Sequence, residues 1–479
     1  MTTALLDRAA PDTGDLARDA RTLAERTARA EEELAALPPR PDRSAAQQQH
    51  AEQIHASARS ARRAFLAVHT DAVYDLLTEG RTRHVRLPEL VEAAAERFPG
   101  LVPTAALMDA ELALVQAHKE GREIDQGIFC GAVLRSPRAG LHLIEAMLRP
   151  TARALELLDA FRSTGRIELD SVLLERRGHA AHLTFLNTHC LNAEDNRLVA
   201  NLETAVDLAL LDDRVRVGVL RGGEVQHPRY AGRRVFSAGI NLKDLRNGAI
   251  SLTRFLLGRE LGCLHKMARG LLLDPAPGAW TDRAVQKPWI GAVDTFAIGG
   301  GMQLLLVLDR VIAEQGSYFS LPAAEEGIVP GLGNLRLTRQ TGGRLARRVI
   351  LGGHRILASD PEAHLICDEV VPAADMDAAV ERAVQELSAP AVAPNRAMLM
   401  LAEEPVDLYR GYLAEFAVAQ SERAYSADVL AKVERRWQHS QAQKTQPQKT
   451  QPQKTQPQNS ASQNSASQNP RSPRSPSRD

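Results

Sequence analysis

Three consecutive glycines, Gly299 to Gly301, stand between two apolar stretches of this chain. Residues 289–293 have the length and composition of a buried strand, and residues 302–308 those of a buried helix. A turn of small residues at a helix start leaves backbone N–H groups free, next to the positive end of the helix dipole. Such donors suit an oxygen that becomes negative, and glycine lets a ligand approach the backbone closely. A triple glycine is also typical of a tight turn without a binding role, so a second motif is needed to distinguish an oxyanion site from a structural turn.

The second motif lies upstream, at residues 235–242, with the sequence VFSAGINL. Taken with residues 297–303 (AIGGGMQ), Asp309 and residues 327–333 (GIVPGLG), it resembles the crotonase (enoyl-CoA hydratase/isomerase) superfamily. The resemblance extends from about residue 181 to about residue 371. It implies an α/β fold with a crotonase-like ββα spiral core that binds an acyl-CoA thioester.

The resemblance also assigns roles to backbone groups. In that superfamily the N–H groups at the positions of Ile240 and Gly300 hold the thioester oxygen, so these two are the expected oxyanion hole. Neighbouring residues of the two motifs, and one upstream histidine, are expected to contact the substrate: His227, Ala238, Gly239, Asn241, Leu242, Gly299 and Gly301.

Two positions depart from the pattern of a hydratase. Where a hydratase has glutamates, this chain has Gln303 and Ala323. Glutamine takes no proton at neutral pH and alanine has nothing to exchange, so water addition, which needs a positioned acid and base, is poorly supported. Glu325 and Glu326 follow closely, but a displacement along an extended segment changes the direction of a side chain.

The regions outside the core narrow the choice of subfamily. Residues 1–180 are rich in Ala, Leu, Arg and Glu and predict an all-helical N-terminal domain before the core, residues 181–375. Residues 376–440 again predict helices, which in this superfamily support trimers or dimers of trimers. Residues 441–479 consist of polar repeats without apolar residues to bury, and predict a disordered tail.

Composition excludes several classes of partner and compartment. The 479 residues contain 59 basic and 59 acidic side chains, so no net positive field favours nucleic acid or an anionic membrane. Four scattered cysteines indicate reduced thiols rather than disulfides or a zinc site. The N-terminus lacks the pattern of a signal peptide, and no stretch predicts a membrane span. We therefore expect a cytoplasmic protein.

A helical extension before a core with Gln303 and Ala323 resembles a branch of the superfamily that oxidises arylacetyl-CoA thioesters in glycopeptide-antibiotic biosynthesis. This branch uses dioxygen without metal, flavin or other cofactor. The resemblance implies 3,5-dihydroxyphenylacetyl-CoA and O2 as substrates, and 3,5-dihydroxyphenylglyoxylate and CoA as products. It places Gln303 at the reacting atoms, and Glu194 and Arg259 at the aryl ring.

Other interpretations stay open. An enoyl-CoA hydratase or isomerase would need Glu325 or Glu326 at the substrate, and a non-catalytic CoA-binding subunit would explain the two departures as decay. Pairs such as His69 and Asp71, or His118 and Glu120, formally fit part of an iron site. Residues two apart do not share a helix face, so we expect no metal site.

Overall fold

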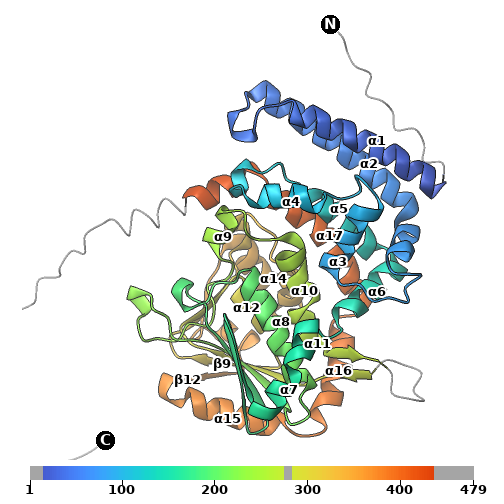
Figure 1. Ribbon diagram of the computed structural model, residues 1–479. Coiled ribbons are helices and arrows are strands. Elements are labelled where there is room, and N and C mark those ends of the chain that lie inside the picture. Colours follow the sequence, from blue (N-terminus) through green and yellow to red (C-terminus); the bar gives the residue numbers. More distant parts are fainter. Residues whose placement is uncertain (1–13, 275–282, 436–479) are drawn as a thin grey trace, which may run out of the picture. The chain divides into compact units, whose positions relative to one another are not determined.

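The computed structural model describes residues 14–274 and 283–435 (Figure 1). The predicted tail, residues 441–479, lies outside the described residues. None of the helices in the described ranges is long and apolar enough to cross a membrane.

A seven-stranded sheet forms the centre of the core. Its strands, in spatial order, are β1 (Arg166–Leu169), β2 (Val172–Arg177), β3 (Ala180–Phe185), β4 (Val217–Gly222), β7 (Trp289–Val293), β9 (Arg310–Glu314) and β12 (Glu369–Val371). The pairs from β1 to β3 are antiparallel, and those from β3 to β12 are parallel. The carboxyl ends of the parallel strands therefore share one edge, which is where open α/β sheets bind ligands.

Side chains of the central strands alternate between two buried faces. In β7, Ile290 and Ala292 pack with α15 (Met376–Leu387), whereas Trp289 and Val293 belong to the larger cluster that includes α8 (Asn196–Leu211). Because both faces are covered, the strand is a continuous apolar run rather than an alternating one.

A smaller sheet carries the glycine turn. Its order is β11 (Ile356–Leu357), β10 (Tyr318–Ser320) and β8 (Phe296–Ile298), with β8 and β10 parallel. The chain passes from β7 through β8 and Gly299 into α12 (Gly300–Leu305). The helix predicted over residues 302–308 is thus present but begins earlier and ends earlier. A two-stranded sheet, β5 (Leu271–Leu273) and β6 (Arg283–Val285), lies apart from both.

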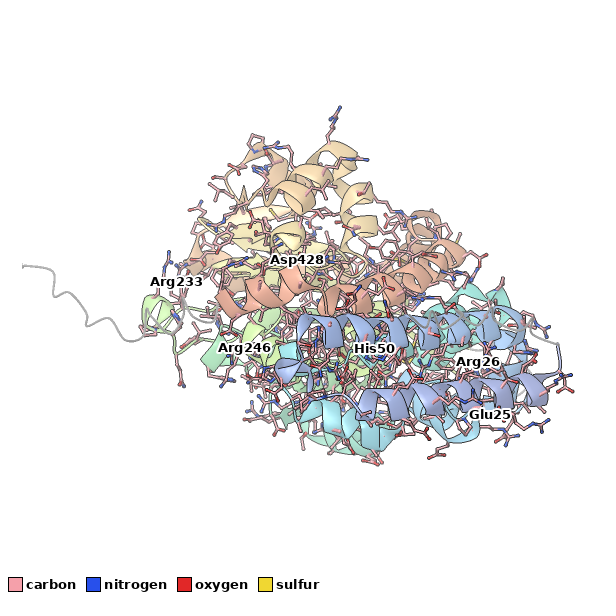
Figure 2. All side chains as sticks on the ribbon, turned by 90° about the horizontal axis from the view of Figure 1, so that it is seen from above. Glu25, Arg26, His50, Arg233, Arg246 and Asp428 are labelled. Carbon is pink, nitrogen blue, oxygen red and sulfur yellow. The ribbon has the colours of Figure 1, made fainter. Side chains whose placement is uncertain are left out.

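Between residues 14 and 165, seven α-helices precede the sheet. They are α1 (Leu16–Ala35), α2 (Ala45–Leu77), α3 (Leu87–Arg97), α4 (Ala105–Leu112), α5 (Glu123–Arg135), α6 (Pro137–Met147) and α7 (Ala152–Thr164). Helices α1 and α2 pair as a hairpin, and Figure 2 shows its outer surface, where Glu25 and Arg26 on α1 and His50 on α2 mix acidic and basic groups.

The helical stretch is shorter than the predicted 1–180. It ends at Thr164, where Gly165 terminates α7 in a left-handed conformation. Residues 166–177 form β1 and β2, a hairpin at the edge of the main sheet. Their alternating pattern is only four to six residues long. It is easily hidden in a segment whose Leu, Glu and Arg residues also favour helix.

Most of the remaining helices pack in the core, and α17 (Val406–Ala424) packs against the N-terminal helices. The others are α9 (Leu242–Arg246), α10 (Leu257–Leu261), α11 (Cys263–Arg269), α13 (Ala323–Glu326), α14 (Gly333–Gly352) and α16 (Val392–Glu403). Residues 427–435 are also helical. Helix α17 packs along α5, so the end of the described chain lies among the N-terminal helices (Figure 1). The predicted architecture, an α/β core between helical regions, is confirmed.

Candidate active site

Two backbone segments that are distant in sequence meet beside the glycine turn. The Ile298 N–H donates to Ser237 O at 3.0 Å, and Ser237 pairs with Ala297 as an isolated parallel bridge. Gly239, at φ 81°, lies so close that an added Cβ would be 3.2 Å from Gly300 N. The approach requires a residue without a side chain in the left-handed region, which is glycine.

This approach leaves two amide groups side by side. In the described part of the chain, neither the Ile240 N–H nor the Gly300 N–H donates to a protein acceptor. Their neighbours are occupied, since Gly239 N donates to Ser237 Oγ at 3.1 Å and Gly299 N to Ser320 O at 2.7 Å. Gly300 is the first residue of α12, where N–H groups have no partner within the helix. Both N–H groups are therefore available to a ligand.

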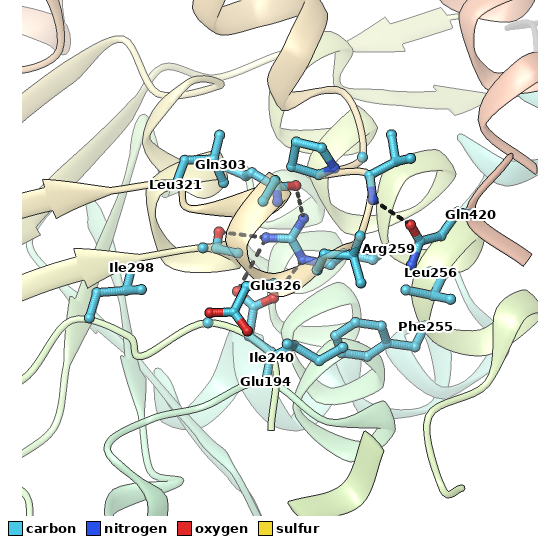
Figure 3. Close-up of a pocket in the computed structure, with 18 of the residues that line it drawn as sticks. Glu194, Ile240, Phe255, Leu256, Arg259, Ile298, Gln303, Leu321, Glu326 and Gln420 are labelled. Carbon is cyan, nitrogen blue, oxygen red and sulfur yellow. Dashed lines mark hydrogen bonds and ion pairs between the residues drawn. The ribbon is translucent and has the colours of Figure 1, made fainter. Parts of the chain in front are cut away.

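A cavity of about 260 Å³ opens beside these amides. Most of its wall is apolar, with Phe255, Leu256, Leu321, Ile328 and Phe416 among the lining residues (Figure 3). The polar or charged side chains on the wall are those of Glu194, Arg259, Glu260, Gln303, Glu326 and Gln420. A mostly apolar pocket with few converging polar groups is typical of a small-molecule site.

Arg259, 4 % exposed, lies at the centre of the polar groups. Its Nε is 2.7 Å from Glu194 Oε2, and its Nη2 donates to Glu194 Oε1 at 3.2 Å and to Gly300 O at 2.7 Å. Its Nη1 donates to Glu260 Oε1 at 3.0 Å and to Gln303 Oε1 at 3.3 Å. Four of these contacts are hydrogen bonds from the two Nη groups, and the contact of Nε with Glu194 is an ion pair.

The pKa shifts of the buried groups follow from burial and from these ion pairs. Burial opposes the charge of Arg259, but Glu194 and Glu260 outweigh it and raise the pKa of the guanidinium. Burial also raises the pKa of Glu260, although Arg259 and Arg336 act in the opposite direction. Arg336 is in turn paired with Glu404, from its Nε to Oε2 at 2.9 Å. A buried chain of alternating charges thus leads away from the cavity toward the C-terminal helices.

Glu194 joins the segments that carry Ile240 and Gly300 to this cluster. Its N–H donates to Gly239 O at 2.7 Å and its carbonyl oxygen accepts from Asn241 N at 2.8 Å, so its backbone holds the segment that carries Ile240. Its carboxylate rests against Gly300, where an added Cβ would lie 2.4 Å from Oε2. A side chain at position 300 would displace the carboxylate.

The structure brings most of the predicted site residues together. The cavity is lined by Glu194, Ala238, Gly239, Ile240, Leu242, Arg259, Gly299, Gly300 and Gln303. Three predicted contacts lie outside it. His227 is exposed on a loop, Asn241 caps α9 through Lys243 N and Asp244 N, and a Cβ on Gly301 would lie 2.7 Å from Ser237 Cβ, facing away from the cavity.

Sequence reasoning missed several lining residues. Glu260 had a usable signal, an acidic side chain inside the apolar stretch 252–264, since such residues are seldom buried without a partner. Phe416 and Gln420 had none, because they reach the cavity from α17. Arg259 and Glu260 follow a π-helical turn, Leu252–Leu256, a feature that often marks functional sites. Among the described residues, no group of three His, Cys, Asp or Glu side chains could hold a metal ion.

Comparisons with known proteins define the family. A family model described as enoyl-CoA hydratase/isomerase matches residues 279–410. The (3,5-dihydroxyphenyl)acetyl-CoA 1,2-dioxygenase of Amycolatopsis orientalis is 56% identical over 415 residues, which are 87% of this chain and 95% of that protein. The chain belongs to the enoyl-CoA hydratase/isomerase family. The family predicted from the two glycine motifs is thereby confirmed.

Other members of the enoyl-CoA hydratase/isomerase family match a smaller part. The 2,3-dehydroadipyl-CoA hydratase of Escherichia coli (strain K12) is 28% identical over 219 residues, 45% of this chain and 74% of that protein. An enoyl-CoA hydratase/isomerase structure from Xanthobacter autotrophicus Py2 covers 58% of this chain and 98% of its own, with 22% identity and a TM-score of 0.47. A match over 87% of the chain, as with the dioxygenase, must include most of the N-terminal helices, whereas one over 45% does not require them.

Proposed function

We propose that this protein is a dioxygenase that converts 3,5-dihydroxyphenylacetyl-CoA and O2 to 3,5-dihydroxyphenylglyoxylate and CoA, without a metal or organic cofactor. The observation that carries the proposal is the pair of unoccupied amides, Ile240 and Gly300, beside a cavity with Gln303 in place of a hydratase glutamate. The identity with the Amycolatopsis enzyme over nearly its whole length supports the substrate.

The reaction balances with the substrate as the only reductant. Two amide donors on the thioester oxygen stabilise the enolate that forms when the α-carbon loses a proton. The enolate, conjugated with an electron-rich ring, reduces dioxygen and forms a C–O bond at the α-carbon. The resulting peroxide attacks the thioester carbonyl and the C–S bond breaks. Cleavage of the O–O bond with loss of the second α-hydrogen gives the keto acid, so four electrons pass to O2, both of its oxygens enter the product, and the thiol leaves with a proton.

Within this proposal Arg259 positions other groups rather than binding the ring. Its two Nη groups donate to protein acceptors and its Nε is paired with Glu194, so these contacts hold the carboxylate of Glu194 and the amide oxygen of Gln303. An amide whose oxygen accepts from a guanidinium turns its nitrogen elsewhere. Gln303 Nε2 is therefore the group that donates to the substrate or the peroxide, and Glu194 is the acceptor for a ring hydroxyl.

A second candidate function has one observation in its favour. Glu326, at the end of α13, lines the same cavity as the oxyanion amides, and a hydratase or isomerase acting on an unsaturated acyl-CoA needs a carboxylate there. The position that a hydratase would use is Ala323, 3 % exposed.

A pair of substrates separates the two functions. We expect CoA release and an arylglyoxylate from 3,5-dihydroxyphenylacetyl-CoA in air, detected by mass spectrometry, and no hydration of crotonyl-CoA. Glu326→Gln should leave the first reaction in place, because the enolate chemistry does not use an acid that adds water. Hydration of crotonyl-CoA that is lost in Glu326→Gln, with no oxidation of the aryl substrate, would establish the hydratase instead.

We also propose a cytoplasmic homo-oligomer, a trimer or a dimer of trimers, that binds neither nucleic acid nor membrane. Helix α16 exposes Met398 (65 %), Leu399 (60 %) and Leu401 (56 %), a set of apolar side chains typical of an interface. The four cysteines carry no disulfide, as a reducing compartment requires. Light scattering should give a multiple of the chain mass, and Leu399→Glu should lower it. A monomeric parent protein would exclude this assembly.

A further inference from the structure

Gln420 presents an amide nitrogen to the cavity from α17. The side chain is 2 % exposed, and its Oε1 accepts a hydrogen bond from Val329 N at 2.7 Å (Figure 3). An N–H can pair only with the amide oxygen, so this bond fixes which end of the amide is which. Within residues 14–274 and 283–435, Nε2 donates to no protein acceptor.

The cavity that this amide nitrogen faces is mostly apolar. Phe255, Leu256, Ile328 and Phe416 line it together with Gln420, and their side chains accept no hydrogen bond. A buried donor without an acceptor costs free energy, and such groups usually mark a function or a bound molecule. The amide nitrogen of Gln420 is therefore available to an acceptor that enters the cavity.

We propose that Gln420 determines substrate specificity, with Nε2 donating to the oxygen of one ring hydroxyl of the arylacetyl thioester. This inference rests on the proposed function. Two hydroxyls in meta positions point away from the ring in different directions, so they need polar groups on two sides. In Figure 3, Gln303 lies at the guanidinium of Arg259, whereas Gln420 lies beside Leu256 and Phe255, so the cluster around Arg259 serves the other hydroxyl.

The packing of α17 gives this residue a fixed position. Helix α17 lies against α5 through two glycines one helical turn apart. A Cβ on Gly127 would lie 2.4 Å from Ser421 Oγ, and one on Gly131 would lie 2.9 Å from Ala414 O. The N-terminal helices therefore hold the helix that carries Gln420, which connects the unusual extension to the choice of substrate.

The inference is tested by measuring the binding of two substrates, with and without the second ring hydroxyl, to the parent protein and to a variant at Gln420. Dissociation constants are measured under nitrogen, where no turnover occurs, for 3,5-dihydroxyphenylacetyl-CoA and 3-hydroxyphenylacetyl-CoA. The parent protein should prefer the first by about 10- to 100-fold, the size expected when a buried donor loses its partner. In Gln420→Met the preference should fall to near one, with the affinity for the second thioester retained. An equal loss for both thioesters, which a structural role through Val329 predicts, would overturn it.

Two further variants control for a failure of the methionine variant to fold and for a change of charge on α17. Gln420→Glu keeps an acceptor for Val329 N but no amide donor, so it should also change the preference, and it serves if the methionine variant does not fold. Glu415→Gln changes the charge of the same helix at a side chain that is 74% exposed, and should leave the preference as it is. If the parent protein binds neither thioester, the proposed function fails as well. If it prefers the dihydroxy substrate and both Gln420 variants do too, only this inference fails.

Discussion

Replacing Ile240 by proline should slow turnover of a bound arylacetyl thioester by about 100- to 1000-fold, the usual effect of losing one oxyanion donor. Proline has no N–H, and the Ile240 N–H is one of the two unoccupied amides at the cavity. The hydrogen bonds that hold this strand, from Glu194 N to Gly239 O and from Asn241 N to Glu194 O, do not use it. The maximal rate of CoA release in air measures the effect, because the interaction strengthens as the enolate forms.

A variant that keeps the amide provides the control. Ile240→Val trims the side chain at the cavity but retains the N–H, so its rate should stay close to that of the parent protein. The oxyanion assignment would be wrong if the proline variant folds, binds the thioester under nitrogen and still releases CoA at the rate of the valine variant.

Replacing Arg259 by methionine should destabilise the fold by about 3–5 kcal/mol, the cost of leaving buried charges without their partner. Methionine fills a similar volume, but Glu194 and Glu260 lose the only cation within 3.5 Å that the described residues give them. Gln303 also loses the donor that orients its amide, so turnover should fall with stability. Urea unfolding measures the first effect and CoA release the second.

Two comparisons isolate the cause. Adding Glu194→Gln to Arg259→Met should restore part of the stability, because one buried charge is removed. Arg254→Met, one turn earlier, removes an arginine that is 62% exposed and paired with Glu92, and should cost little. Equal losses for Arg254→Met and Arg259→Met would show that the buried cluster does not depend on its arginine.

The sequence predicted the parts of this protein that depend on backbone geometry. The meeting of residues 237–240 with residues 297–300 requires glycine at fixed places. A Cβ on Gly239 would lie 2.8 Å from Ile298 O, and one on Gly300 would lie 2.4 Å from Glu194 Oε2. Where only glycine fits, a single sequence can show the requirement, because the glycine itself is visible in it. The apolar run of β7 is readable for a similar reason, since both of its faces are buried.

The parts that depend on long-range side-chain contacts were not readable. Arg259 was expected at the aryl ring, but partners from two other segments, Glu194 and α12, accept hydrogen bonds from its guanidinium, and only the fold brings them together. Gln420 lies near the end of a helix that the sequence assigned to oligomerisation, whereas the fold packs that helix on α5. The edge strands β1 and β2 were too short to distinguish from helix by composition.

The most direct test of the central claim is oxygen uptake by chelator-treated protein supplied with 3,5-dihydroxyphenylacetyl-CoA, with ¹⁸O2 as the gas and mass spectrometry of the product. The proposed reaction predicts one O2 consumed for each CoA released, and an arylglyoxylate that carries both labelled oxygens. CoA release without oxygen uptake, giving the unoxidised acid, would show that the oxyanion hole serves thioester hydrolysis and would contradict the account.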